Sequence, residues 1–277
     1  MDNKMGKIEP YSAKQHLSPN QLNMYMRCSA QWMFRYVEGI KIRPGISLLF
    51  GNCFDEVSNT NFRQKMETFE DLPVDDLKDC FVTEWDGNKD RYQIEEDDKP
   101  EEKREQGILL VDHWRKTRAP AIQPAGVQEK LSFSRPEHPY DIIQYSDVIT
   151  ADSGIIDNKT TTKSPSKDKE TGVYLPKSND HIVQMSLYEI GYEQKFGERP
   201  EYLELDYAVI KKDPDNIQVQ WTPRDYHRKY VLSLIDMVTH GIESKVFIPN
   251  RGNFLCSKRF CGYAAICEAE FGGKVKE

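Results

Sequence analysis

Apolar residues in the first part of the chain recur at the three- and four-residue spacing of amphipathic helices. A Ser-Pro pair at residues 18–19 is typical of a helix start, and the apolar positions continue to Gly39, so we expect one or two helices there. A further helix is predicted over residues 48–66, with an apolar side formed by Leu49, Phe50, Cys53, Phe54, Val57 and Phe62. An acidic, loosely packed connection over residues 86–102 and a helix over about residues 101–118 come next.

After Pro120 the spacing changes to the alternation of β-strands. Strands are predicted over residues 127–133, 141–150 and 154–159, joined by turns that contain Pro or Gly, which favours an antiparallel meander. The remaining predicted elements are a polar loop (164–177), a helix (179–196), two strands (202–210 and 217–221) and a helix that ends near residue 240.

Composition narrows the class of protein. The chain has 277 residues, of which 38% are hydrophobic, enough for one large domain or a domain with a helical elaboration. No apolar run approaches the roughly 18 residues of a membrane span, and residues 1–10 lack the apolar segment of a signal peptide, so we expect a cytosolic protein that does not bind membranes. The net charge of -7 argues against a broad basic surface for duplex nucleic acid but leaves room for a local basic groove.

Two acids and a lysine fall near the ends of predicted strands. Asp147 is close to the end of one strand and Asp157 lies in the next, after a short turn, so the two could meet around one ion. Lys159 shares a strand face with Asp157 because side chains alternate with a period of two. Cleaving a phosphodiester requires a nucleophile made at neutral pH and compensation of charge, and carboxylate-bound Mg²⁺ supplies both. The ammonium of Lys159 could orient or activate the attacking water.

Helices supply three further candidates. Gln184 and Tyr188 are four residues apart and share one helix face, so Tyr188 could contact a phosphate and Gln184 could hold Lys159 or a base. Asp55 lies near a helical turn that faces the core or a cleft. Taken alone, each candidate is equally a solvated strand end, an exposed turn or a polar helix face. Their order along the chain is what favours a site.

Three cysteines, Cys256, Cys261 and Cys267, fall within twelve residues near the end of the chain. Thiolates so spaced can converge on a soft metal centre, and Cys28 could supply a fourth ligand if the two ends of the chain pack together. In an intracellular chain a disulfide framework is not expected. The alternative is that the thiols are small buried residues, which is our interpretation of the other two cysteines.

The ordered set resembles the PD-(D/E)XK nuclease superfamily, in particular the RecB-like exonucleases, which include CRISPR-associated RecB-type nucleases and phage recombination nucleases. The resemblance extends from about Leu17 to Glu268. That family has a helix with Gly-x-x-x-His, an isolated Asp, an acid-x-Lys strand and a Gln-x-x-x-Tyr helix. The matching residues here are Gly51 with Asp55, Asp147, the strand Ile155 to Thr160, and Gln184 with Tyr188.

The resemblance implies an α/β fold with a restriction-endonuclease-like core, in which helices flank a central mixed sheet. It divides the chain into an N-terminal helical region (1–119), a nuclease core (120–245) and a cysteine-rich segment (246–277). The implied activity is metal-dependent hydrolysis of DNA, as an exonuclease that acts on single-stranded ends and leaves a 5′-phosphate, in recombination, repair or CRISPR-type processing. The implied location is the cytoplasm of a bacterium or of a phage-infected host, and protein partners stay open.

The resemblance also assigns residues to roles. Asp55, Asp147 and Asp157 would bind one or two Mg²⁺ or Mn²⁺ ions, and the catalytic set would be Asp147, Asp157, Lys159, Gln184 and Tyr188. Lys163 and Lys167, in the lysine-rich polar loop, are candidates for nucleic-acid binding, with a solvated loop as the alternative.

The cysteines have a counterpart in the iron–sulfur members of the family. Cys28, Cys256, Cys261 and Cys267 would close a [4Fe–4S] cluster that joins the two ends of the chain without a catalytic role. Four residues separate Cys256 from Cys261 where the family usually has two after the second cysteine, so Zn²⁺ stays an alternative.

The sequence also departs from the family in the catalytic motifs. Asp55 stands where His is usual, which gives the metal a hard oxygen ligand, and Gln144 replaces a Gly that often precedes the isolated Asp by three. Glu129 is similar in placement to an acid on the family's first core strand. The first departure keeps open a nucleic-acid- or partner-binding module that has retained the fold without activity, and a structural metal protein with incidental acids is a further alternative.

Overall fold

The structure, a computed structural model, describes residues 16–277, which form two compact units. The sheet unit contains residues 43–131 and 144–224, and the terminal unit contains residues 16–42, 132–143 and 225–277. The three-segment division expected from the sequence stays a prediction. The expectation that residues 1–10 carry no signal segment lies outside the described residues.

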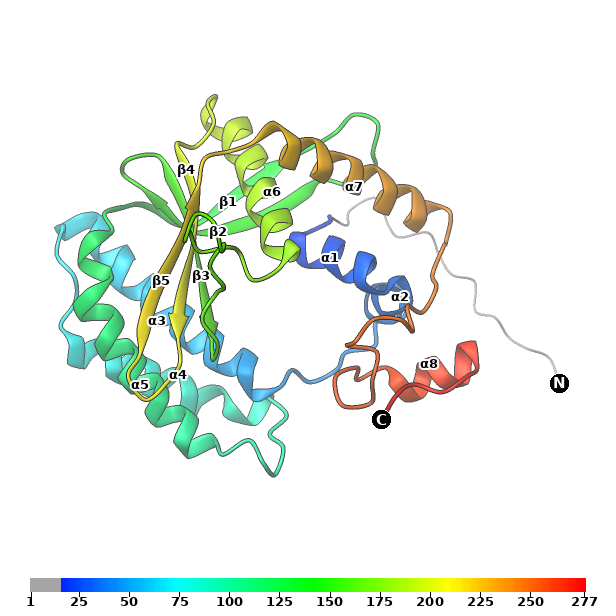
Figure 1. Cartoon of the computed structure of the whole chain (residues 1–277), viewed down its shortest axis with the longest axis horizontal. Coiled ribbons are helices and arrows are strands. Elements are labelled where there is room, and N and C mark those ends of the chain that lie inside the picture. The colour runs from blue at the N-terminus through cyan, green and yellow to red at the C-terminus, as the bar shows by residue number, and fades with distance from the viewer. Residues whose placement is uncertain (1–15) are drawn as a thin grey trace. The chain divides into compact units, whose positions relative to one another are not determined.

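The sheet unit is built on a five-stranded mixed sheet (Figure 1) with the order β1-β2-β3-β4-β5. The strands are β1 (Pro124–Phe133), β2 (Ile142–Thr150), β3 (Gly154–Thr161), β4 (Tyr202–Val209) and β5 (Asp215–Trp221). β3 pairs antiparallel with β2 and parallel with β4, and β4 pairs antiparallel with β5. Two parallel neighbours need a crossover connection, which helix α6 (Asn179–Phe196) supplies between β3 and β4. The α/β fold with a mixed sheet is therefore confirmed.

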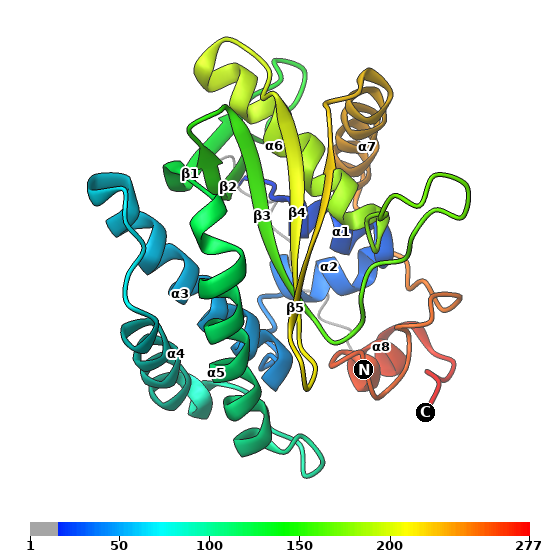
Figure 2. The same ribbon diagram turned by 60° about the vertical axis from the view of Figure 1, so that its left-hand side comes forward.

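Helices cover both faces of the sheet (Figure 2), with α6 on one side. The other side carries α3 (Ile46–Thr68), α4 (Val74–Asn88) and α5 (Pro100–Thr117). Val148 and Ile156 pack with α3, α4 and α5, whereas Ile149 and Leu205 pack with residues of α6. Successive strand residues thus face opposite sides, as the predicted alternation requires.

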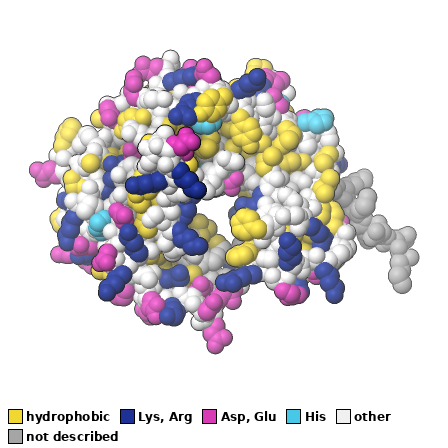
Figure 3. All heavy atoms as spheres, viewed as in Figure 1, with side chains coloured by type: hydrophobic (Ala, Val, Ile, Leu, Met, Phe, Trp, Pro, Cys, Tyr) yellow, Lys and Arg dark blue, Asp and Glu magenta, His cyan; other side chains and the backbone are white. Residues whose placement is uncertain are grey.

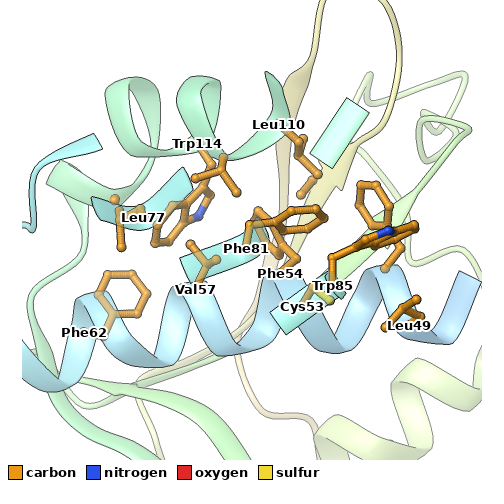
Figure 4. Packing of buried hydrophobic residues seen from close by; sticks show 14 of the residues in the cluster. Leu49, Cys53, Phe54, Val57, Phe62, Leu77, Phe81, Trp85, Leu110 and Trp114 are labelled. Carbon is orange, nitrogen blue, oxygen red and sulfur yellow. The ribbon is translucent and has the colours of Figure 1, made fainter. Parts of the chain in front are cut away.

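Helices α3, α4 and α5 bury an aromatic cluster (Figure 4). The rings of Phe54 and Phe62 lie edge-on to Trp114, with centroids 5.7 and 5.4 Å away. Phe81 stacks on Trp85 at 6.0 Å. Burial of such large rings stabilises the arrangement and holds α3 against the sheet.

Helix α4 is absent from the sequence-based expectations. Its buried stripe is short: Leu77, Phe81 and Trp85 are at most 1% exposed, and six of the other residues are charged. The loose connection expected over residues 86–102 is correspondingly shorter, because α4 runs to Asn88 and the Gln93 backbone N–H donates to the Pro44 carbonyl at 2.8 Å.

The terminal unit joins helices from both ends of the chain, namely α1 (Pro19–Arg27), α2 (Ser29–Tyr36), α7 (Asp225–Glu243) and α8 (Ala264–Phe271). The Ser18 hydroxyl caps α1, as the sequence predicts. Tyr25 donates a hydrogen bond to the Val246 carbonyl at 2.6 Å, and Phe34 stacks on Tyr263 with centroids 5.7 Å apart. Between residues 16 and 277 no helix has both the length and the apolar character to cross a membrane.

Candidate active site

The strands that carry the two predicted acids separate at the site. β2 and β3 are paired at Val148 and Ile156. Beyond that pair, the backbone N–H of Asn158 donates to Asp147 Oδ2 at 2.8 Å. Since a backbone N–H must find an acceptor, a carboxylate here takes the place of a strand partner, and Asp147 is fixed in the gap between the strands.

Asp157 is 1% exposed, and each of its two carboxylate oxygens has a polar neighbour. Its Oδ1 accepts hydrogen bonds from Gln184 Nε2 at 3.0 Å and from the Tyr188 hydroxyl at 3.3 Å. Its Oδ2 forms an ion pair with Lys159. Gln184 thus holds the acid and not Lys159, and Tyr188, 3% exposed, has no free face on which a base could stack.

Asp55 joins this group from α3. It is half-buried and forms no hydrogen bond or ion pair with any residue from 16 to 277, but its charge interacts with Asp147, Lys159 and Asp157. One turn earlier, a Cβ at Gly51 would lie 3.5 Å from Thr160 Oγ1, so α3 runs close to β3. The structure therefore brings all three predicted aspartates and the lysine together.

The site has more acid than base. Burial, followed by repulsion from Asp147, raises the pKa of Asp55 to about 8, and burial with repulsion from Asp157 raises the pKa of Asp147 to about 7. Burial lowers the pKa of Lys159, but attraction to the acids outweighs it, so the pKa is raised and the side chain stays an ammonium. Carboxylates that are at least partly buried and repel one another fit a hard divalent cation such as Mg²⁺ or Mn²⁺.

Gln128 on β1 is a site residue that the sequence did not indicate. Its backbone has φ 52°, and its Nε2 donates to Asp147 Oδ1 at 3.1 Å and to Asn59 Oδ1 at 3.3 Å. A non-glycine residue in this region costs about 1–2 kcal/mol. Glu129, the acid that the family resemblance indicated on the first strand, does lie on β1, and its carboxylate pairs with Lys195. Alternation along β1 is interrupted at Gln128, which no sequence pattern signals.

Two further amides fasten the strands to the helices around the site. Asn158, between the acid and the lysine of the motif, donates from Nδ2 to Ser58 Oγ at 3.1 Å and so ties β3 to α3. Gln144, at the position where the family often has Gly, donates to the Leu187 carbonyl and ties β2 to α6. The substitution of that Gly therefore has a structural role here.

The lysine-rich loop follows β3. Lys163 and Lys167 are exposed, and Lys167 Nζ lies 4.5 Å from the centroid of the Tyr174 ring. Lys177 Nζ donates to the Lys163 carbonyl at 2.8 Å. Figure 3 shows acidic and basic side chains interspersed on the face in view.

The four predicted cysteines lie in the terminal unit, where Cys28, Cys256, Cys261 and Cys267 line one cavity of about 190 Å³. All four are free thiols. Burial raises the pKa of Cys261 and of Cys267, and the neighbouring thiols add to the shift. Among the described residues no three of these sulfur atoms lie within 4.8 Å of one another.

A different group meets that distance in residues 16–277: Glu137, His138 and Asp236, with ligand atoms all within 4.8 Å of one another. The Arg135 guanidinium bonds to both carboxylates, and His138 Nε2 lies 2.6 Å from Asp236 Oδ1. The group could accept an ion, but a cation already balances its acids. Among the described residues, the three aspartates of the sheet unit do not form so tight a group.

Comparison with known proteins gives one family and one fold. The sequence profile of the PD-(D/E)XK nuclease superfamily matches residues 16–268. The crystal structure of a provisionally named exonuclease from Eubacterium rectale is similar in fold, with a TM-score of 0.59, 12% identity and 90% of each chain covered. The structure of SSO0001 aligns with a TM-score of 0.38 and 15% identity over 81% of this chain and 96% of that one. No curated protein matches the sequence.

Proposed function

The chain belongs to the PD-(D/E)XK nuclease superfamily, and we propose that it is a metal-dependent nuclease that hydrolyses phosphodiester bonds of DNA, as an exonuclease on single-stranded ends. Recombination, repair and CRISPR-type processing are the settings that such an activity fits. The observation that carries the proposal is the meeting of Asp55, Asp147 and Asp157 with Lys159 where β2 and β3 separate.

In this proposal the three aspartates hold Mg²⁺ or Mn²⁺. The bound cation supplies a water of lowered pKa and offsets the charge that develops on the phosphate. Gln184 and Tyr188 orient Asp157 through its Oδ1, and Gln128 orients Asp147 in the same way. Lys159 brings a fixed positive charge to the place where the phosphate must lie, and its N–H groups can orient the attacking water.

Substrate binding in the proposal uses the loop after β3. Lys163 and Lys167 would pair with backbone phosphates, which requires exposed cations close to the site rather than a basic surface. Tyr174, held against Lys167, could stack on a base of a single strand. Such contacts favour single-stranded ends over an intact duplex.

For the terminal unit we propose a [4Fe–4S] cluster held by Cys28, Cys256, Cys261 and Cys267. The support is their shared cavity of about 190 Å³. A single zinc ion, with Zn–S bonds of about 2.3 Å, draws its four thiolates close together and leaves little room between them. Iron and acid-labile sulfide analysis of anaerobically purified protein, together with its visible absorption, tests the cluster; zinc without iron would favour the alternative.

The activity is tested with end-labelled single- and double-stranded DNA, and matching RNA, in Mg²⁺ or Mn²⁺. We expect shortening of single-stranded DNA that EDTA stops and that Lys159→Met lowers by about 100-fold or more. Lys211→Met is the control, since Lys211 is an exposed lysine of the same unit paired with Asp215. Stable binding without cleavage by the wild type would instead support the inactive binding module.

A further inference from the structure

His181 stands on the α6 face that carries the site residues. It precedes Gln184 by three residues and Tyr188 by seven, a spacing that puts all three on one side of the helix. The charges of Lys159 and Asp157 act on it. The catalytic motifs do not include this position.

The hydrogen bonds of Tyr207 determine which nitrogen of His181 carries the proton. Tyr207, on β4, is 1% exposed; its hydroxyl accepts from the Lys177 backbone N–H at 3.0 Å and lies 2.8 Å from His181 Nδ1. A buried O–H must be donated to an acceptor, and a backbone N–H is not one. Tyr207 therefore donates to Nδ1, and the proton of the neutral imidazole lies on Nε2.

The imidazole is also held neutral. Burial, with the charge of Lys159 next, lowers the pKa of His181 to about 4; Lys177 adds to this and Asp157 opposes it. Nε2–H forms no hydrogen bond within the part of the chain that the structure describes. The side chain thus presents one N–H donor of fixed orientation, without a charge, beside the lysine and acid of the site.

We propose that His181 binds the substrate, through donation of Nε2–H to a non-bridging phosphate oxygen of the nucleic-acid strand next to the cleaved bond. The inference rests on the proposed nuclease function. A phosphate oxygen is an acceptor only, so a fixed donor suits it, and the scissile phosphate must lie beside Lys159. A purely structural His181, which only supports Tyr207, is the competing explanation.

Three substitutions separate the two explanations. His181→Phe keeps a ring but removes both nitrogens, and we expect a loss of about 10- to 100-fold in kcat/KM and in affinity for single-stranded DNA measured in EDTA. His181→Gln can present an amide N–H at a similar reach and should recover part of the loss. Tyr207→Phe removes the hydroxyl that fixes the tautomer of His181 and should lower kcat/KM and affinity a few-fold. Should the Phe variant not fold, His181→Asn replaces it, because Asn keeps an acceptor for Tyr207 without a donor that reaches the substrate.

A modified substrate gives the decisive comparison. A single methylphosphonate linkage, moved along the strand, removes one phosphate acceptor at a time. At the linkage that His181 contacts, the methylphosphonate should lower the affinity of the wild-type protein. It should not lower the affinity of His181→Phe further, because that variant has already lost the contact. Equal affinity and kcat/KM for wild type and the variant, or losses that simply add at every linkage, would overturn the role of His181. Absence of both binding and cleavage by the wild type would instead overturn the nuclease proposal.

Discussion

The backbone of Gln128 offers a quantitative test of how the site is held. Its φ of 52° is strained for any residue with a side chain, by about 1–2 kcal/mol. In an ordinary strand Ala is more stable than Gly by about 0.5–1 kcal/mol. Gln128→Ala and Gln128→Gly lose the same hydrogen bonds to Asn59 and Asp147, so those losses cancel between the two variants. The Gly variant should therefore be the more stable, by ~1 kcal/mol.

Lys130 supplies the matched control, because it is an exposed neighbour on β1 whose φ is not positive. There, Ala should be more stable than Gly in the free energy of unfolding measured by urea titration. Both Gln128 variants should also bind Mn²⁺ about 10- to 100-fold more weakly, because Asp147 loses a partner that orients it. A Gln128→Ala protein as stable as Gln128→Gly, or more so, would refute the reasoning from strain.

Three other substitutions give independent predictions. Tyr188→Phe removes the hydroxyl that donates to the acid but keeps the buried ring, so cleavage should fall by about 10-fold with little change in melting temperature, whereas Tyr192→Phe should cleave normally. In the wild type, His181 takes up a proton near pH 6.5 when the chain is unfolded but only near pH 4 when it is folded, so the free energy of unfolding should fall by up to about 3 kcal/mol as the pH drops between these values. His181→Asn removes the titrating group and should reduce this fall, which urea titrations at each pH would measure. Arg118→Met leaves the buried acids Glu204 and Asp206 without their cation and should lower the free energy of unfolding by about 3 kcal/mol or more; a change below 1 kcal/mol would contradict this.

The sequence predicts those parts of the site that depend on regular spacing. Period two puts Asp157 and Lys159 on one strand face, and the four-residue spacing puts Gln184 and Tyr188 on one helix face, where they meet Asp157. Most of the strands and helices follow from the same regular patterns, whereas the mixed order of the sheet was expected only from the family resemblance. Asp55 is harder to predict from the sequence, because only the close approach of α3 to β3 brings it near the other acids.

Other features depend on contacts that no local pattern encodes. Gln128 reaches Asp147 through a left-handed backbone inside a strand, whereas the family resemblance pointed to its neighbour Glu129. His181, on α6, becomes a donor of fixed tautomer only through Tyr207, which comes from strand β4. Helix α4 has only a short stripe of apolar residues among several acidic ones, so the spacing of apolar residues did not indicate a helix there.

The central claim is that Asp55, Asp147 and Asp157 together form one binding site for a divalent cation. Anomalous scattering from crystals soaked in Mn²⁺ tests it most directly. The account predicts a peak bound by these three carboxylates, which Asp147→Asn weakens or removes. A peak confined to Glu137, His138 and Asp236, or no peak beside the three aspartates, would contradict it.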